Sequence, residues 1–287
     1  MAGIIRAAGG NRGPLGGPWA DQRRGSLSDN LPMTERSPRL LAIETSTDAL
    51  SLAVGDAACH ATFSGPGAAQ ASATLLPAVQ SLLARVGWSL ADLDAIVFAR
   101  GPGAFTGLRT ACAVAQGLAY GVRTATHPNG LPVLPVDTLL ALAATAHAAH
   151  VQAGGHCPAV IVALLDARMD ELYVALYRSG PQGLHTEPLQ APRLCAPADL
   201  AGWLRQVLPA GVAASDVLLA GNVFDVYAAA LQGLSGERLP ALPTAEALLR
   251  LAPGLLAAGA AVPASEAMPL YVRDKVARTT AEREAAA

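Results

Sequence analysis

Two carboxylates and three hydroxyls are consecutive in the segment ETSTD, residues 44–48. Carboxylate oxygens bind magnesium, and the ion in turn binds nucleotide phosphates. The same residue types also form polar turns, in which Ser and Thr side chains bond to the local backbone. The sequence leaves both interpretations open. If the segment binds a phosphate or nucleotide, the candidate residues are Glu44, Thr45, Ser46 and Thr47, together with Gly221 and Asn222 after a later apolar run.

A second charged cluster lies in the segment DARMDE, between apolar runs at 159–165 and 172–177. The three acids in this segment can clamp a ligand together with the arginine. They can also pair with one another in a solvated turn. The residues concerned are Asp166, Arg168, Asp170 and Glu171.

A third group contains His147 and His150, three positions apart on a predicted helix, with His156 and Cys157 nearby. The group superficially resembles a metal site. No acidic second ligand accompanies it and the surrounding sequence is rich in alanine, so we expect no metal ion to bind here. The chain also has no Ser in a GxSxG segment, which argues against a Ser-His-Asp hydrolase.

The segment 96–121 places a glycine-punctuated turn between an apolar strand-like run and an apolar helix-like run. Glycine permits positive φ or close approach by another group, and proline fixes the turn. A helix that starts behind such a turn can bind an anion through its free N–H groups. The alternative is a tight connection without a ligand, and the spacing fits neither a Walker loop nor a dinucleotide fingerprint. The residues of this turn motif are Gly101, Pro102, Gly103, Phe105, Thr106, Gly107 and Arg109.

The helix expected at 108–120 is almost wholly apolar, with Arg109 and Gln116 as its strongly polar pair on one stripe. An outer helix of an α/β lobe normally has a wider polar face. The helix is therefore either deeply buried in this chain or part of a subunit interface shared with a helix at 74–86, and we favour the interface. Its expected residues are Leu75, Leu76, Val79, Leu82 and Leu83, and Leu108, Ala111, Cys112, Ala115, Leu118 and Ala119.

Hydrophobic periodicity predicts two successive sets of strands and helices. Because hairpins mixed with crossover helices occur twice, we expect two α/β lobes with a cleft between them. The lobes are expected at 39–137 and 138–275, followed by a flexible tail at 276–287. The first set has strands at 40–43, 50–54, 59–64, 95–99 and 132–136 and helices at 74–86 and 108–120. The second has strands at 159–165, 172–177 and 216–220 and helices at 138–150, 197–207, 224–232 and 244–258.

Composition restricts the classes of function. Apolar residues make up 52% of the 287 residues but aromatic residues only 4%, so the core must consist of Ala, Leu and Val. A net charge of −2 provides no strong field that would attract nucleic acid to the chain by itself. The four cysteines have no CxxC spacing, which fits a reducing cytoplasm. The segment that comes closest to a membrane span, 245–263, contains charged residues and proline, so we expect no association with a membrane.

Residues 1–38 are rich in Gly, Arg and Pro and have no hydrophobic period. We expect them to be disordered, or to be a mis-annotated extension whose true start is Met33 rather than Met1.

Several segments together closely resemble the TsaB (YeaZ) family. They occur in the family's order from about Leu40 to Arg273, and GPGAFTGLR and DARMDE are highly specific. The matching segments are LLAIETSTDALSLAV, LLP at 75–77, ARGPGAFTGLRTACAVAQGLAYG, LLDARMDELYVALY, AGN at 220–222 and PLYVR at 269–273.

The resemblance implies a two-lobed α/β fold of the actin, heat-shock ATPase and sugar-kinase type. It also implies a role in making threonylcarbamoyladenosine next to the anticodon of tRNA, as a non-catalytic subunit that binds and activates the catalytic subunit TsaD. ATP and a metal would belong to the partner subunits, so this chain would need no cofactor. The ATPase TsaE would join the complex and tRNA would be bound only through it. The helices near 73–86 and 106–120 would form a bundle with those of TsaD, or with a second copy in a homodimer.

The sequence departs from a catalytic pattern at two places. No HxxxH motif occurs on the first long helix, where residues 70–74 read QASAT, and Glu44 stands where the family usually has Asp. Both departures agree with a non-catalytic subunit. The alternatives are an ATP-binding or ATP-hydrolysing enzyme of the same superfamily and a glycopeptidase, although the sequence lacks the metal or nucleophile group that a glycopeptidase requires.

Overall fold

The computed structural model describes residues 37–56, 60–67 and 70–273. These residues belong to one compact unit that begins at Ser37. The expectations for residues 1–36 and for the tail lie outside the described residues.

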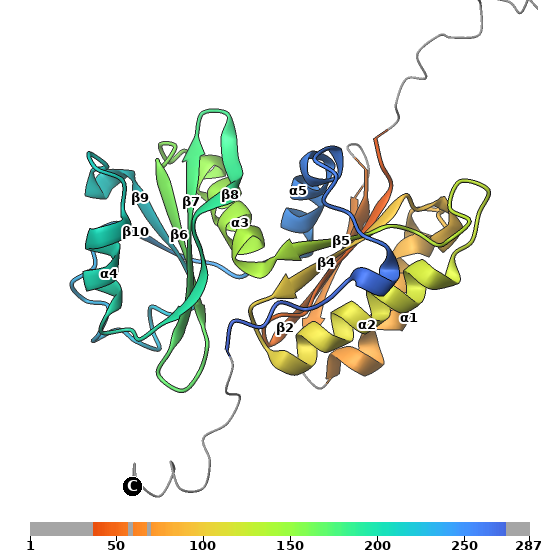
Figure 1. Cartoon of the computed structure of the whole chain (residues 1–287), viewed down its shortest axis with the longest axis horizontal. Coiled ribbons are helices and arrows are strands. Elements are labelled where there is room, and N and C mark those ends of the chain that lie inside the picture. The colour runs from red at the N-terminus through yellow and green to blue at the C-terminus, as the bar shows by residue number, and fades with distance from the viewer. Residues whose placement is uncertain (1–36, 57–59, 68–69, 274–287) are drawn as a thin grey trace, which may run out of the picture. The chain divides into compact units, whose positions relative to one another are not determined.

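The first sheet has five strands in the order β3-β2-β1-β4-β5, and β1 pairs antiparallel with β2 and parallel with β4 (Figure 1). The predicted hairpin is confirmed, because Leu40 lies opposite Gly55 and Glu44 opposite Ser51. The elements are β1 (Leu40–Glu44), β2 (Ala49–Gly55), β3 (His60–Pro66), α1 (Ala71–Arg85), β4 (Ala95–Gly101), α2 (Phe105–Gly121) and β5 (Val133–Asp137).

The second sheet has the order β10-β9-β6-β7-β8. Two of its strands, β8 and β10, were not expected, and the helix expected at 224–232 is wrong because those residues form turns. The elements are α3 (Thr138–Gln152), β6 (Val160–Asp166), β7 (Leu172–Gly180), β8 (Gly183–Cys195), α4 (Leu200–Val207), β9 (Val217–Gly221), β10 (Glu237–Pro240) and α5 (Ala245–Ala257).

Side-chain alternation along β1 shows how the first sheet is covered on both faces. Leu41 and Ile43 pack with the apolar sides of α1 and α2, whereas Leu40 and Ala42 face a second core cluster. That second cluster also contains residues of α3, α5, β6 and β7, so α3 and α5 lie between the two sheets (Figure 1). The two sheets therefore share the apolar cluster around α3 and α5, and the expected mixed α/β fold with two sets of strands and helices is confirmed.

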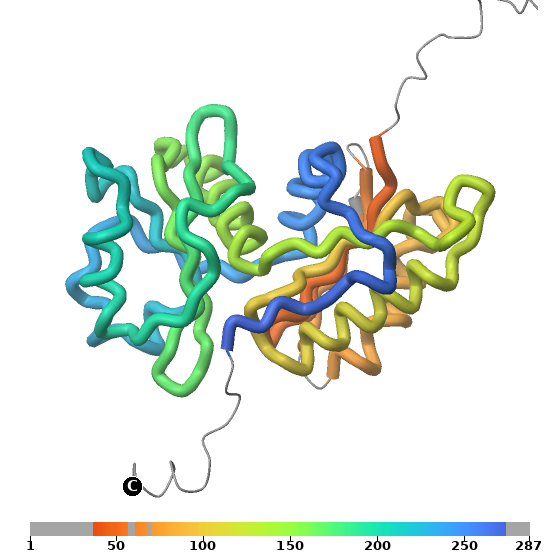
Figure 2. The backbone as a smooth tube through the Cα atoms, viewed as in Figure 1, coloured from red at the N-terminus to blue at the C-terminus, as the bar shows by residue number. Residues whose placement is uncertain are grey.

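The chain returns to the first sheet before it ends. Helix α5 contacts β1, β2, β4 and β5, and Val262 forms an antiparallel bridge with Val133 of β5. Residues 262–273, which we call the C-terminal strap, then follow α2 (Figure 2), where Gln116 Nε2 donates to the carbonyl of Ala267 at 2.9 Å. The expected boundary between 137 and 138 stays a prediction, but the C-terminal lobe expected at 138–275 includes residues that pack on the first sheet.

The expected interface residues need a correction. All of them except Leu76 and Leu118 are buried in the core of this chain, because they lie on the sides of α1 and α2 that face the first sheet. Leu76 is 46% exposed. The buried positions are Leu75, Val79, Leu82, Leu83, Leu108, Ala111, Cys112, Ala115 and Ala119.

Among the described residues, we find no helix with the length and apolar character that crossing a membrane requires.

Candidate functional site

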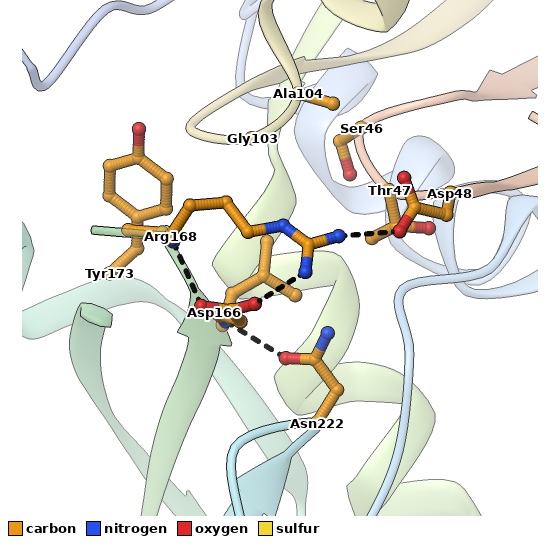
Figure 3. A pocket seen from close by; sticks show the side chains of 11 residues that line it. Ser46, Thr47, Asp48, Gly103, Ala104, Asp166, Arg168, Tyr173 and Asn222 are labelled. Carbon is orange, nitrogen blue, oxygen red and sulfur yellow. Dashed lines mark hydrogen bonds and ion pairs between the residues drawn. The ribbon is translucent and has the colours of Figure 1, made fainter. Parts of the chain in front are cut away.

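Turns from both sheets meet at a small cleft of about 100 Å³ (Figure 3). The first sheet contributes the β1–β2 turn and the glycine turn that follows β4. The second contributes the end of β6, the β6–β7 turn and the residue after β9. The lining residues are Ser46, Thr47, Asp48, Gly103, Ala104, Leu165, Asp166, Ala167, Arg168, Tyr173 and Asn222.

The glycine turn is packed against the β1–β2 turn. A Cβ on Gly107 would lie 1.9 Å from the carbonyl oxygen of Thr45, and one on Gly103 would lie 2.4 Å from that of Ser46. Thr45 Oγ1 donates to the Gly107 carbonyl at 2.7 Å, and the Ala104 N–H donates to the Ser46 carbonyl at 2.6 Å. Because this N–H group already has an internal partner, the geometry favours the tight connection over an anion cradle.

Glycine is required at position 101 because the backbone of the C-terminal strap passes close to it. It has a φ of +119°, which L side chains rarely adopt, and a Cβ there would lie 2.5 Å from the carbonyl oxygen of Leu270 in the C-terminal strap. The strap continues past the start of α2, where the rings of Tyr271 and Phe105 have centroids 4.7 Å apart. The Arg109 guanidinium lies 3.8 Å from the Phe105 ring centroid, and its Nε donates to the Tyr271 hydroxyl. Arg109 is thus oriented by aromatic contacts.

Glu44 lies behind the cleft and is 1% exposed. Its Oε1 accepts the Ser46 N–H at 2.5 Å, whereas its Oε2 is buried without a hydrogen-bond partner among the described residues. Burial raises the pKa of Glu44 to about 7, although the hydroxyl and the N–H of Ser46 lower it in part. Glu44 lines neither this cleft nor the larger pocket beside it, so its carboxyl does not face the space in which a ligand would lie.

We expect Glu44→Gln to remove a pH dependence of stability. A carboxyl whose pKa rises from 4.5 to about 7 on folding binds more protons in the folded state, so its ionisation destabilises the fold as pH rises through this window. The unfolding free energy of the variant minus that of wild type should increase by about 3 kcal/mol from pH 4.5 to pH 7. Above pH 7 this difference should stay constant. Urea unfolding at several pH values measures this. A difference that is constant with pH would contradict the assignment.

The residues that were expected to bind a nucleotide do not all lie at one pocket. Thr47, Gly221 and Asn222 line a larger pocket of about 730 Å³, whereas Glu44 and Thr45 are buried away from it. Close packing also explains why position 221 is glycine, since a Cβ there would lie 1.7 Å from the carbonyl oxygen of Leu164 on β6. Nucleotide binding at these residues stays a prediction.

The acidic segment after β6 pairs largely within the chain. Asp166 accepts the Arg168 N–H at 2.8 Å and the Tyr227 hydroxyl at 2.8 Å, and its N–H donates to Asn222. Burial and the bond to Asp166 raise the pKa of Tyr227 to about 12, so Tyr227 acts as a donor. These contacts, together with the ion pair to Arg168, hold the Asp166 carboxylate in place at the cleft.

Two ion pairs of this segment could not be predicted from the sequence, because the paired residues are far apart along the chain. Arg168 reaches Asp48, 120 positions away, and Glu171 pairs with Arg273 in the C-terminal strap. No local spacing indicates such pairs.

The histidines form separate contacts rather than a common site. His150 Nε2 lies 2.8 Å from the His156 carbonyl and its Nδ1 lies 3.2 Å from Glu237, while His147 lies 3.8 Å from the Cys157 sulfur. Within residues 37–56, 60–67 and 70–273, no three His, Cys, Asp or Glu side chains are grouped so that they could hold a metal ion.

Comparison with known proteins connects this geometry to a family. The family model described as "TsaD: tRNA N6-adenosine threonylcarbamoyltransferase" matches residues 65–280. The tRNA threonylcarbamoyladenosine biosynthesis protein TsaB of Escherichia coli is 32% identical over 83% of this chain and 96% of its own length. The Haemophilus influenzae protein of the same name is 30% identical over 83% and 94%.

A solved structure agrees with these sequence relatives. YeaZ from Pseudomonas aeruginosa superposes with a TM-score of 0.67 at 32% identity, over 82% of this chain and 99% of that protein. The chain belongs to the TsaB (YeaZ) family of tRNA threonylcarbamoyladenosine biosynthesis proteins.

Proposed function

We propose that this chain is a non-catalytic cytoplasmic subunit that binds and activates TsaD during threonylcarbamoyladenosine synthesis. The ATPase TsaE would join the same complex, and tRNA would be bound through the complex rather than by this chain. The arrangement of Asp166 and Glu44 supports a non-catalytic role, because Asp166 is bonded to Arg168 and Tyr227 of this chain and Glu44 is buried behind the cleft.

The outer surface of α1 and α2 is the observation that carries this proposal. Neither helix contains an Asp or Glu, and Leu76 and Tyr120 are 46% and 62% exposed. A Cβ on Gly117 would meet no atom within 4 Å, so another helix can approach closely there. Because the TsaD family model matches this chain, TsaD should present equivalent helices, and the two pairs can pack as a pseudo-symmetric bundle. A homodimer would use the same surface when TsaD is absent.

Ala113→Glu tests the surface. Ala113 is exposed on α2, so a carboxylate there should leave the fold intact but place an unpaired charge in the proposed interface. We expect at least a hundredfold loss of TsaD affinity in pull-down and titration, equivalent to about 3 kcal/mol. Ala198→Glu, the same change at an exposed position before α4, is the matched control and should bind normally. Binding of the Ala113 variant at wild-type strength would exclude this surface.

A further inference from the structure

The β6–β7 turn has an unusual backbone. Arg168, Met169 and Asp170 are consecutive and have φ values of 60°, 58° and 58°. Non-glycine residues avoid this left-handed region because their Cβ crowds the following carbonyl oxygen. Three in succession persist only where surrounding contacts hold them, which is typical of clamps and switches.

Contacts from two directions hold this turn. From within, the Arg168 N–H donates to Asp166 Oδ1 at 2.8 Å, and the Glu171 N–H donates to the Arg168 carbonyl at 3.2 Å. From the C-terminal strap, Arg273 donates to the Arg168 carbonyl at 3.2 Å and forms an ion pair with Glu171. The Arg273 side chain is only 11% exposed, so this support is largely shielded from solvent.

The turn presents the Arg168 guanidinium to carboxylates from both sheets (Figure 3). Its Nη2 lies 2.7 Å from Asp48 Oδ2 in the β1–β2 turn, and its Nη1 lies 3.2 Å from Asp166 Oδ2 at the end of β6. The guanidinium thus bridges two negative charges across the cleft, as a bound cation would do. Asp48 also lines the adjoining pocket of about 730 Å³, so this bridge lies between the two spaces.

We propose that Arg168 is a clasp that closes the cleft through Asp48, and that Arg273 holds the turn in the conformation that presents the clasp. The apolar core around α3 and α5 joins the two sheets and extends to Ala167 and Tyr173 beside the turn, so an opening motion would be confined to the exposed Arg168–Asp48 pair and the cleft in front of it. Arg168 and Asp48 are 70% and 75% exposed, so their pair is weak and easily released. The clasp therefore lets the cleft open transiently without unfolding.

Hydrogen–deuterium exchange of the full chain tests the clasp. We expect Arg168→Met, which keeps the aliphatic stem, to speed exchange about two- to fivefold in peptides covering 44–50 and 219–225. Arg193→Met is the matched control, because Arg193 lies on β8 and contacts Trp203 instead of the cleft. The effect should shrink in 1 M salt, because salt screens an exposed pair.

A second variant separates the clasp from the turn itself. Asp48→Asn removes the distant carboxylate and leaves the contacts of Arg168 with Asp166 in place. The clasp predicts that Asp48→Asn speeds exchange as Arg168→Met does, and that the double variant is no faster than the faster single variant. Unchanged exchange in Asp48→Asn, or additive effects in the double variant, would overturn the proposal.

Discussion

Replacing Gly107 with alanine is expected to destabilise the fold by about 3 kcal/mol. Alanine favours helices over glycine by about 1 kcal/mol, so propensity alone predicts a gain. The new Cβ would, however, lie 1.9 Å from the Thr45 carbonyl oxygen, which is backbone and cannot rotate away. Either the start of α2 or the β1–β2 turn must move, and the Thr45–Gly107 hydrogen bond would be lost with that movement. Urea unfolding followed by circular dichroism measures the loss.

Gly117→Ala in the same helix is the control for this prediction. A Cβ at Gly117 would meet no atom within 4 Å, so only the propensity term remains and the variant should gain about 0.5–1 kcal/mol. If both glycine variants shifted stability in the same direction, close packing would not be the reason for glycine at position 107.

Ala115→Glu is expected to destabilise the chain by about 4 kcal/mol or more, and to leave it largely unfolded or aggregated. Ala115 is fully buried in the same apolar cluster as Leu75 of α1 and Phe98 of β4. A carboxylate there would lose its hydration, and the larger side chain would not fit. Since small domains have only about 5–15 kcal/mol of stability, one such change removes much of it.

The comparison with Ala113→Glu makes this result interpretable. Ala113 is two residues away and exposed, so its variant should unfold within about 0.5 kcal/mol of wild type. Thermal unfolding of the two variants side by side should show one folded and one unfolded protein. If Ala115→Glu were as stable as wild type, the assignment of position 115 to the core would be wrong. If the prediction holds, loss of partner binding by an Ala115 variant says nothing about the interface.

The strands of the first sheet could be predicted because their sequence patterns report burial directly. The mainly apolar residues 50–54 are all buried, and the glycines of the turn after β4 mark backbone contacts that admit no Cβ. The orientation of helix α2 was harder to predict, since a helix is equally apolar whether it packs on a sheet of its own chain or on a partner protein. Only the structure shows that Ala111 and Ala115 face inward while Ala113 and Gly117 face outward.

Other errors have equally physical causes. Strand β8 contains Pro188 and Pro192, which reduce strand propensity, but it lies at a sheet edge, where proline is tolerated. The segment 224–232 has helical periodicity but forms successive turns, in which the Tyr227 N–H donates to the Val223 carbonyl and the Leu231 N–H donates to the Tyr227 carbonyl without a continuous helix. In the site, the local turn chemistry of 44–48 was predictable, whereas the pairing of Arg168 with Asp48 depends on two segments 120 residues apart.

Because α5 packs on the first sheet but follows it by more than a hundred residues in the sequence, the order of synthesis bears on how this lobe folds. Proteins emerge from the ribosome N-terminus first, so β1 to β5 are available long before residues 245–257. Until α5 arrives, the sheet face that carries Leu40, Ala42 and Val97 is covered by α3, mainly at β4 and β5, and lacks the cover that α5 gives to β1 and β2. The nascent chain must therefore keep an incompletely covered lobe in solution until α5 has been translated, and a chain truncated before α5 would leave the apolar face at β1 and β2 without this cover.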